Sequence, residues 1–331
     1  MKSLFETVST PCLLAFALLA ASPAGAITVV SVTTFASGTA VNATAPDSIA
    51  LSDGSIWVAY TNGGSSTGGG VSTIVQYDIH GNVMNQYSVA GSVDGLKVDP
   101  YRGLVWCLQN QDGNSTLTFI QPGKGITPDS PYQFAVQSGS RGFDDVVFRN
   151  GQVFLSYTNP VNPTDPTIQL LQPHTNPIAV VPVLTMGATG TNLATGQTNQ
   201  PTAQHDPDSL KLTLSGDLML SSGDDGQLIF VQQPATAAQA VSFLQLLDPS
   251  GIPVSGLDDA RFADSTRGTF YVADTNNNRI LAIQATEIPY GSLYASIGSL
   301  NEFASVDLST GIVTPVVSNL NAPHGVLFIA Q

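Results

Sequence analysis

The chain has 331 residues, of which only 10% are charged, and its 24 acidic and 10 basic side chains give a formal net charge of −14. This charge balance excludes nucleic acid and anionic membrane surfaces as partners, and it favours cations. The 31 glycines and 21 prolines punctuate the sequence as turns, and no helical periodicity follows the first segment, so an all-β fold is expected.

The amino terminus has the features of a cleaved signal peptide. Lys2 precedes an apolar stretch over 13–21, and the small residues at 24–26 form a cleavage site. This stretch is too short to span a bilayer, and no later stretch reaches the roughly 18 apolar residues that a span needs. We therefore expect a signal peptide at 1–26, a single domain at 27–331, and a periplasmic or secreted monomer.

The cysteines exclude an intramolecular disulfide in the exported chain. Cys12 lies in the predicted signal peptide, which leaves Cys107 as the one cysteine after it. Cys107 sits in an apolar run over 104–108, so we interpret it as a small buried core residue. Stability must come from the core and the strand ladders.

One motif recurs six times: an apolar residue or proline, Asp, a small or acidic residue, and an apolar run. The motif begins at Pro46, Val93, Phe143, Pro207, Leu257 and, with His in place of Asp, Pro323. Successive copies are 47, 50, 64, 50 and 66 residues apart, which is the period of propeller blades with insertions. Each copy is expected to open one blade.

A second strand is predicted after each of the first five motifs. A glycine follows seven to ten residues after the Asp, and further apolar runs come next at 56–58, 104–106, 153–155, 218–220 and 270–272. Two such runs around a glycine turn predict a β-hairpin. In the first unit, 73–79 and 83–89 supply two more strands, and four strands make a propeller blade.

The two long intervals and the chain ends depart from the regular repeat. Residues 187–204 are a polar insertion expected on the side of the motifs, and the last interval holds two further strands at 304–308 and 312–317. Only seven residues follow His324, so the last blade must borrow strands from the segment after Ile27 or from the last interval. We predict a six-bladed β-propeller closed by pairing of the N- and C-terminal strands; a β-sandwich would not explain the repeat.

The motif side chains are expected to crowd one mouth of the channel. This ring consists of Asp47, Asp94, Asp144, Asp208, Asp258 and His324. Two carboxylates ~6 Å apart repel by roughly 2 to 3 kcal/mol at an effective dielectric near 20, so the ring needs protonation, backbone N–H donors or a bound cation. Hard oxygen ligands select Ca²⁺ or Mg²⁺, and their number and irregular supply favour Ca²⁺. The competing hypothesis is that each Asp caps the turn that enters its strand.

Two histidines are candidates for proton transfer or metal ligation. His205 precedes Asp208 by three residues, and His324 occupies the sixth ring position, whereas His80 and His174 lie in predicted turns and loops. The sequence has no Gly-x-Ser-x-Gly elbow, His-Glu-x-x-His motif, Cys-x-x-Cys pair or dinucleotide fingerprint. Serine, zincin and nicotinamide chemistry are therefore not expected.

The blade openings resemble the SMP-30/gluconolactonase/LRE-like group of six-bladed propellers. The run Asp94-Gly95-Leu96-Lys97-Val98-Asp99-Pro100 is similar to a stretch of that group in which an Asn at the position of Asp94 binds metal. Pro207-Asp208-Ser209 is similar to a stretch whose Asp binds metal and is the usual candidate base. Residues 271–280 instead resemble an NHL repeat.

The resemblance implies a Ca²⁺-assisted hydrolase of lactones or esters, with Asp208, His205 and His324 as catalytic candidates. The ring would hold the cation and a small molecule would bind at the channel mouth. The alternative is a non-catalytic NHL-type propeller that binds a ligand or a protein. The chain departs from the group because its ring is almost entirely Asp, where the group mixes Glu, Asn and Asp.

Overall fold

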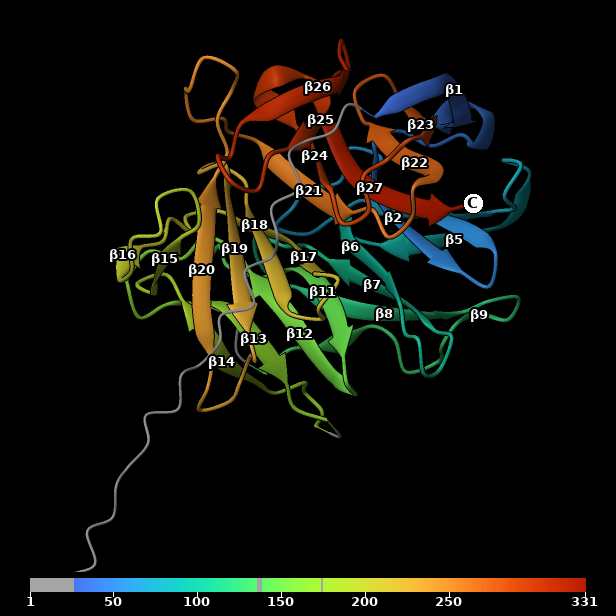
Figure 1. Cartoon of the computed structure of the whole chain (residues 1–331). Coiled ribbons are helices and arrows are strands. Elements are labelled where there is room, and N and C mark those ends of the chain that lie inside the picture. The colour runs from blue at the N-terminus through green and yellow to red at the C-terminus, as the bar shows by residue number, and fades with distance from the viewer. Residues whose placement is uncertain (1–26, 136–138, 174) are drawn as a thin grey trace, which may run out of the picture.

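The computed structural model describes residues 27–135, 139–173 and 175–331, and its six β-sheets surround a central axis (Figure 1). The predicted six-bladed propeller is confirmed. The predicted signal peptide at 1–26 and His174 lie outside the described residues. None of the helices that the structure describes is long and apolar enough to cross a membrane.

The first four blades follow the chain in order, each from its innermost strand outward. Blade 1 has β2 (Pro46–Ser52), β3 (Ser55–Tyr60), β4 (Val71–Tyr77) and β5 (Val83–Ala90). Blade 2 has β6 (Val93–Val98), β7 (Val105–Gln109), β8 (Thr116–Gln121) and β10 (Tyr132–Gln133), and β9 (Gly125–Ile126) also pairs with β8. Blade 3 has β11 (Phe143–Arg149), β12 (Gln152–Tyr157), β13 (Pro166–Leu171) and β14 (Val180–Thr185).

Blade 4 accommodates the polar insertion at its outer edge. Its four main strands are β17 (Pro207–Leu212), β18 (Leu218–Ser222), β19 (Gln227–Gln232) and β20 (Ala240–Gln245). The insertion forms β15 (Thr189–Asn192) and β16 (Gln200–Pro201), and β15 pairs in parallel with β20. The outermost strand is the one that gains these partners, so the insertion extends the blade away from the axis.

The last two blades exchange strands. Blade 5 begins with β21 (Leu257–Phe262), but the next hairpin, β22 (Arg267–Asp274) and β23 (Arg279–Thr286), belongs to blade 6. The chain then returns to complete blade 5 with β24 (Leu293–Ile297), β25 (Glu302–Val306) and β26 (Val313–Val317), of which β25 and β26 were predicted. The predicted hairpin between the Leu257 motif and 270–272 is wrong, because β21 pairs with β24.

Both ends of the chain meet in blade 6. The order of this sheet is β27 (Pro323–Ala330), β22, β23 and β1 (Thr28–Ser37) from the axis outward. The terminal strands close the ring within one sheet, with the β22–β23 hairpin between them rather than in direct contact with each other. The exchange therefore supplies the two strands that the short terminal segments lack. Two 3-10 helices, η1 (Gly38–Val41) and η2 (Gly298–Leu300), lie beside blades 6 and 5.

The core lies between neighbouring blades rather than inside any one of them. All six residues of β3 are buried, and Trp57 on this strand packs with Leu96 and Cys107 of blade 2. Cys107 is fully buried, as predicted, and burial raises its pKa above the ordinary thiol value. A strand that is buried on both faces consists of consecutive apolar residues. This explains the apolar runs that predicted the second strand of each blade.

The six motifs coincide with six β-bulges. On β2, Pro46 pairs with Tyr60 and Ile49 pairs with Val58, so Asp47 and Ser48 fall within the register shift. The same irregularity occurs at the motif of every other innermost strand. A bulge re-aims side chains and locally ends the ladder. The repeated bulge thus explains why the motif position and the residue after it are both restricted in type.

Candidate functional site

The ring side chains separate into two clusters on opposite sets of blades. Asp94, Asp144 and Asp208 form a carboxylate cluster on blades 2, 3 and 4, and their closest oxygens lie within 4.8 Å of one another. Asp47, Asp258 and His324 form a histidine cluster on blades 1, 5 and 6, within the same limit. The bulged inner strands thus bring all six predicted ring residues to the axis, in two groups of three.

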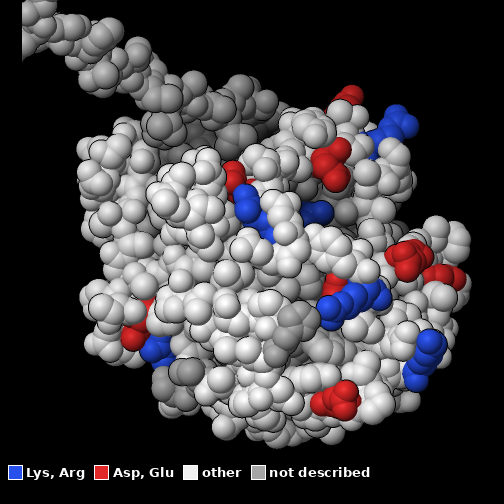
Figure 2. Space-filling view, turned by 90° about the horizontal axis from the view of Figure 1, so that it is seen from below, with Lys and Arg blue, Asp and Glu red and all other residues white. Residues whose placement is uncertain are grey.

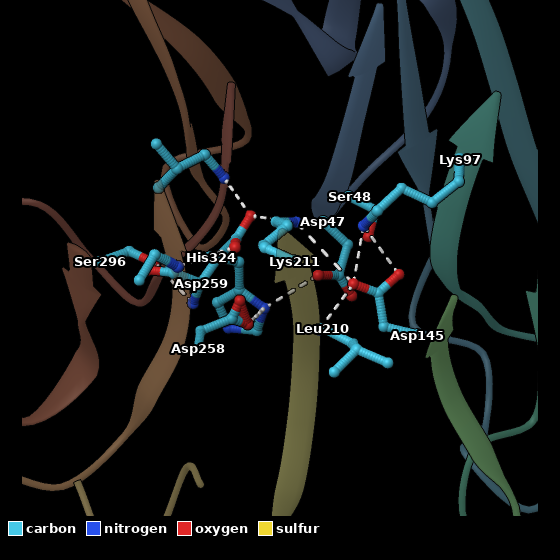
Figure 3. A network of polar contacts seen from close by, with 12 residues as sticks. Asp47, Ser48, Lys97, Asp145, Leu210, Lys211, Asp258, Asp259, Ser296 and His324 are labelled. Carbon is cyan, nitrogen blue, oxygen red and sulfur yellow. Dashed lines mark hydrogen bonds and ion pairs between the residues drawn. The ribbon is translucent and has the colours of Figure 1, made fainter. Parts of the chain in front are cut away.

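The histidine cluster contains its own positive charge. His324 Nδ1 lies 3.1 Å from Asp47 Oδ1 and 3.3 Å from Asp258 Oδ1 (Figure 3). Burial would lower the pKa of His324, but Asp258 and Asp47 outweigh it and raise this pKa to about 10. Burial also raises the pKa of Asp258, to about 7, although His324 opposes the rise. At neutral pH, His324 is therefore an imidazolium between two carboxyls.

The carboxylate cluster has no such balance. Burial, followed by repulsion from the other ring carboxylates, raises the pKa of Asp94, Asp144 and Asp208 well above the ordinary value. A hydrogen bond between the carboxyls of Asp94 and Asp144 opposes the rise at Asp94 and adds to it at Asp144. Gln111 Nε2, 3.2 Å from Asp94 Oδ1, is the one side-chain amide of the described residues that donates to this cluster.

The competing hypothesis of turn capping is contradicted. No backbone amide of the described residues donates a hydrogen bond to any of the five ring aspartates. In blades 3 and 5 the next residue has that role instead, because Asp145 accepts from the amide of Val146 at 2.8 Å and Asp259 from that of Ala260 at 2.7 Å. Protonation or a bound cation remains to stabilise the carboxylate cluster.

A charged layer of four side chains, which was not predicted, lies immediately below the ring. Lys97 Nζ contacts both carboxylate oxygens of Asp145 at 2.8 and 2.7 Å. Lys211 Nζ lies 2.8 Å from Asp259 and 3.8 Å from Asp145 (Figure 3). Burial would raise the pKa of Asp145, but Lys97 and Lys211 hold it below the ordinary value. Two acids and two bases balance in this layer, so the unbalanced charge is in the ring.

A sequence signal for this layer exists. The residue after the motif Asp is acidic in blades 3 and 5, and a lysine follows three residues after the motif Asp in blades 2 and 4. Each lysine precedes its acidic partner by 48 residues. A lysine one blade before an acid, repeated twice at the same separation, predicts an ion pair across a blade interface.

Glycine occupies the same motif position where the next blade approaches closely. A Cβ atom on Gly95 would lie 2.2 Å from the carbonyl oxygen of Asp144, and one on Gly325 would lie 2.5 Å from that of Asp47. No side chain fits at these distances unless the backbone moves. The two glycines therefore let neighbouring inner strands come close enough to form the clusters.

His205, the remaining candidate, and its polar neighbours lie at the periphery of the mouth. The side chain of His205 is 61% exposed, and its Nδ1 lies 2.8 Å from Asp225, outside both clusters. Burial and the nearby Asp224 raise the pKa of Asp206 to about 6. Asn62 is a loop residue with φ of 55° whose side chain accepts a hydrogen bond from the amide of Thr44, before β2, and donates one to Thr73.

The donor set of the carboxylate cluster fits a hard divalent cation. Three carboxylates can supply the oxygens that Ca²⁺ and Mg²⁺ prefer, and raised pKa values are expected of a site that is incomplete without positive charge. The histidine cluster fits less well, because a cation there would have to displace the proton of His324. If a cation binds at the mouth, Asp94, Asp144 and Asp208 are the residues to hold it.

Comparisons with solved structures find other proteins of similar fold. A streptogramin B lyase is 13% identical, with 89% of this chain and 90% of that chain covered and a TM-score of 0.49. The periplasmic gluconolactonase of Pseudomonas aeruginosa is 12% identical, with 86% and 88% covered and a TM-score of 0.49. No family model and no curated protein matches the chain.

Proposed function

We propose that the chain is a propeller that binds one divalent cation, Ca²⁺ in preference to Mg²⁺, and hydrolyses a small lactone or ester at the channel mouth. The observation that supports it is the carboxylate cluster of Asp94, Asp144 and Asp208. Its three acidic groups lie within 4.8 Å of one another, and no positive side chain belongs to the cluster. A buried concentration of like charge is costly unless a cation balances it, and such sites are often functional.

The residues divide the chemistry between the two clusters. A bound cation would polarise the carbonyl oxygen and lower the pKa of a coordinated water. Asp208 would accept a proton from the attacking water. It lies on blade 4, which adjoins blade 5 of the histidine cluster. His324, charged at neutral pH and held by Asp47 and Asp258, would donate a proton to the leaving alkoxide. His205 contacts neither cluster and would take no part in proton transfer.

The test is hydrolysis of a panel of lactones and esters by the exported chain, with Ca²⁺ and after chelation. We expect activity only with the cation, and Asp208→Asn should lower kcat by about 10²-fold while it keeps an oxygen ligand. His205→Gln is the matched control and should keep kcat within about twofold, because its partner Asp225 is outside both clusters. Ca²⁺ binding without hydrolysis above the rate of Ca²⁺ alone would contradict the catalytic part and favour a non-catalytic binding propeller.

We also propose that the chain is exported and cleaved after Ala26. The first described strand begins at Thr28, so cleavage at this position would leave every strand of the propeller intact. Mass spectrometry of the protein from the cell envelope or medium should identify Ile27 as its first residue. Recovery of a chain that retains Met1 would contradict export by this route.

A further inference from the structure

We propose that Asp145 is a positioning residue that holds the three inner strands of the carboxylate cluster at the spacing a cation requires. The inference rests on the proposed cation site. It assigns a role to a side chain that does not belong to the cluster and is not a ligand candidate itself.

The contacts of Asp145 reach the same three blades that supply the cluster. Lys97 of blade 2 donates to both of its oxygens, at 2.8 and 2.7 Å. The amide of Val146 in blade 3 donates to Oδ1 at 2.8 Å. The amide of Leu210 in blade 4 donates to Oδ2 at 3.0 Å (Figure 3). Each donor lies two or three residues after a cluster aspartate in the same strand. One carboxylate therefore connects the three bulges that present Asp94, Asp144 and Asp208.

The physical reason for such a connection is the repulsion within the cluster. Three ionised carboxylates repel one another and move apart unless the backbone that carries them is fixed. If they move apart, part of the free energy of cation binding is spent on bringing them together again. A buried carboxylate with donors from three strands fixes the backbone before binding, which lowers the cost of assembling the site. Outer-shell partners of this kind usually contribute about 10- to 100-fold to metal affinity.

The chain contains a matched control for this role. Asp259 occupies the equivalent position in blade 5, and both aspartates are 2% exposed. It receives Lys211 Nζ of blade 4 at 2.8 Å, the amide of Ala260 at 2.7 Å and the amide of Val326 in blade 6 at 2.8 Å. The three strands that it connects carry Asp208, Asp258 and His324, so it reaches two members of the histidine cluster and only one of the carboxylate cluster. Asp145 and Asp259 have nearly the same chemistry and burial, but Asp145 connects all three strands of the carboxylate cluster and Asp259 reaches only one of them.

The experiment compares Asp145→Asn with Asp259→Asn in the chain that starts at Ile27. Calorimetric titration with Ca²⁺ gives the affinity, and thermal unfolding without cation gives the stability. We expect both variants to lose similar stability, but Asp145→Asn to lower Ca²⁺ affinity by about 10- to 100-fold and Asp259→Asn by less than about threefold. Equal loss of affinity in the two variants, or none in Asp145→Asn, would overturn the positioning role.

A second pair of variants is milder, in case Asp145→Asn does not fold. Lys97→Met removes the link to blade 2 and leaves Asp145 with the amides of Val146 and Leu210 and with Lys211. We expect it to lower Ca²⁺ affinity by about tenfold. Lys97→Arg keeps a cation that can bind the carboxylate with two hydrogen bonds, so it should restore most of that affinity. If the unsubstituted chain binds no Ca²⁺, both this inference and the proposed function fail. If that chain binds Ca²⁺ and Lys97→Met binds equally well, this inference alone fails.

Discussion

His324 Nδ1 lies 3.1 Å from Asp47 Oδ1, although the two residues are 277 positions apart in the chain. The contact joins β27, the innermost strand of blade 6, to the innermost strand of blade 1. It also places one positive charge among the ring carboxyls. The histidine cluster therefore holds a positive charge of its own that partly balances its carboxyls, whereas the carboxylate cluster on the opposite blades holds none.

His324→Gln should change how stability depends on pH. The pKa of His324 rises from 6.5 to about 10 on folding, so its contribution to stability is complete below 6.5 and is lost as pH rises from 6.5 to about 10. The variant should lack this loss and unfold at a lower temperature at about pH 6, with a difference of about 1 kcal/mol for a partly exposed ion pair. The test is to measure the melting temperatures of both proteins without divalent cations over this pH range. If the two melting temperatures change with pH in parallel, the raised pKa of His324 is contradicted.

Stabilisation by Ca²⁺ should increase with pH. The folded pKa values of Asp94, Asp144 and Asp208 lie well above the ordinary 3.8, so without a cation these groups stay protonated above the pH at which they ionise in the unfolded chain. Their folded-state protons favour folding at low pH, and this advantage is lost as pH rises towards the folded values. Ca²⁺ competes with these protons, so its effect on the melting temperature should be larger at about pH 8 than at about pH 5. A shift that is independent of pH would mean that Ca²⁺ binds elsewhere.

A methyl group on Gly95 or Gly325 should destabilise the propeller. A Cβ atom would lie 2.2 Å or 2.5 Å from a carbonyl oxygen of the next blade, so Gly95→Ala and Gly325→Ala should each lower the free energy of unfolding by about 1 to 3 kcal/mol. Ser209 occupies the same motif position in blade 4, and Ser209→Ala should change the free energy of unfolding by less than about 0.5 kcal/mol. Urea titration measures all three, and alanine tolerated equally at the three positions would contradict the close approach.

Asp274 should stabilise the exchanged hairpin. It is fully buried at the end of β22, where it accepts hydrogen bonds from Arg279 Nε at 2.7 Å and from the amide of Asn321, just before β27, at 2.7 Å. Asp274→Ala leaves these donors unsatisfied and should lower the free energy of unfolding by about 2 to 3 kcal/mol. Asn277→Ala removes one donor to the same carboxylate and should cost about 1 kcal/mol or less. Similar urea midpoints for the two variants would contradict a particular role of Asp274 in stabilising the exchanged hairpin.

The architecture was predictable because blades repeat. The motif at each innermost strand, the glycine turn and the buried second strand are local signals, and they predicted six blades and the strands β25 and β26. The exchange of strands between blades 5 and 6 was not predictable in the same way. The run at 270–272 has the composition of any second strand, and local sequence does not tell which neighbouring sheet a hairpin joins. The one clue was the unusually long last interval, which held two strands more than its blade needed.

The candidate site was predictable in its members but not in its grouping. Asp94 and Asp47 follow the same motif, yet one joins a cluster without positive charge and the other contacts His324. The division depends on which side chains face each other across the channel, which a linear pattern does not contain. The Lys97–Asp145 and Lys211–Asp259 pairs had a signal in their shared 48-residue separation, but this signal is visible only after the blades are aligned.

The most direct measurement is a calorimetric titration of the chain that starts at Ile27 with Ca²⁺, repeated for Asp144→Asn and Asp47→Asn. Asp144 belongs to the carboxylate cluster and Asp47 to the histidine cluster, and both are buried side chains at the same motif position. The account predicts one Ca²⁺ per chain, a loss of affinity of at least about tenfold in Asp144→Asn, and little change in Asp47→Asn. No binding to the unsubstituted chain, or equal loss of affinity in the two variants, would contradict a cation site at Asp94, Asp144 and Asp208.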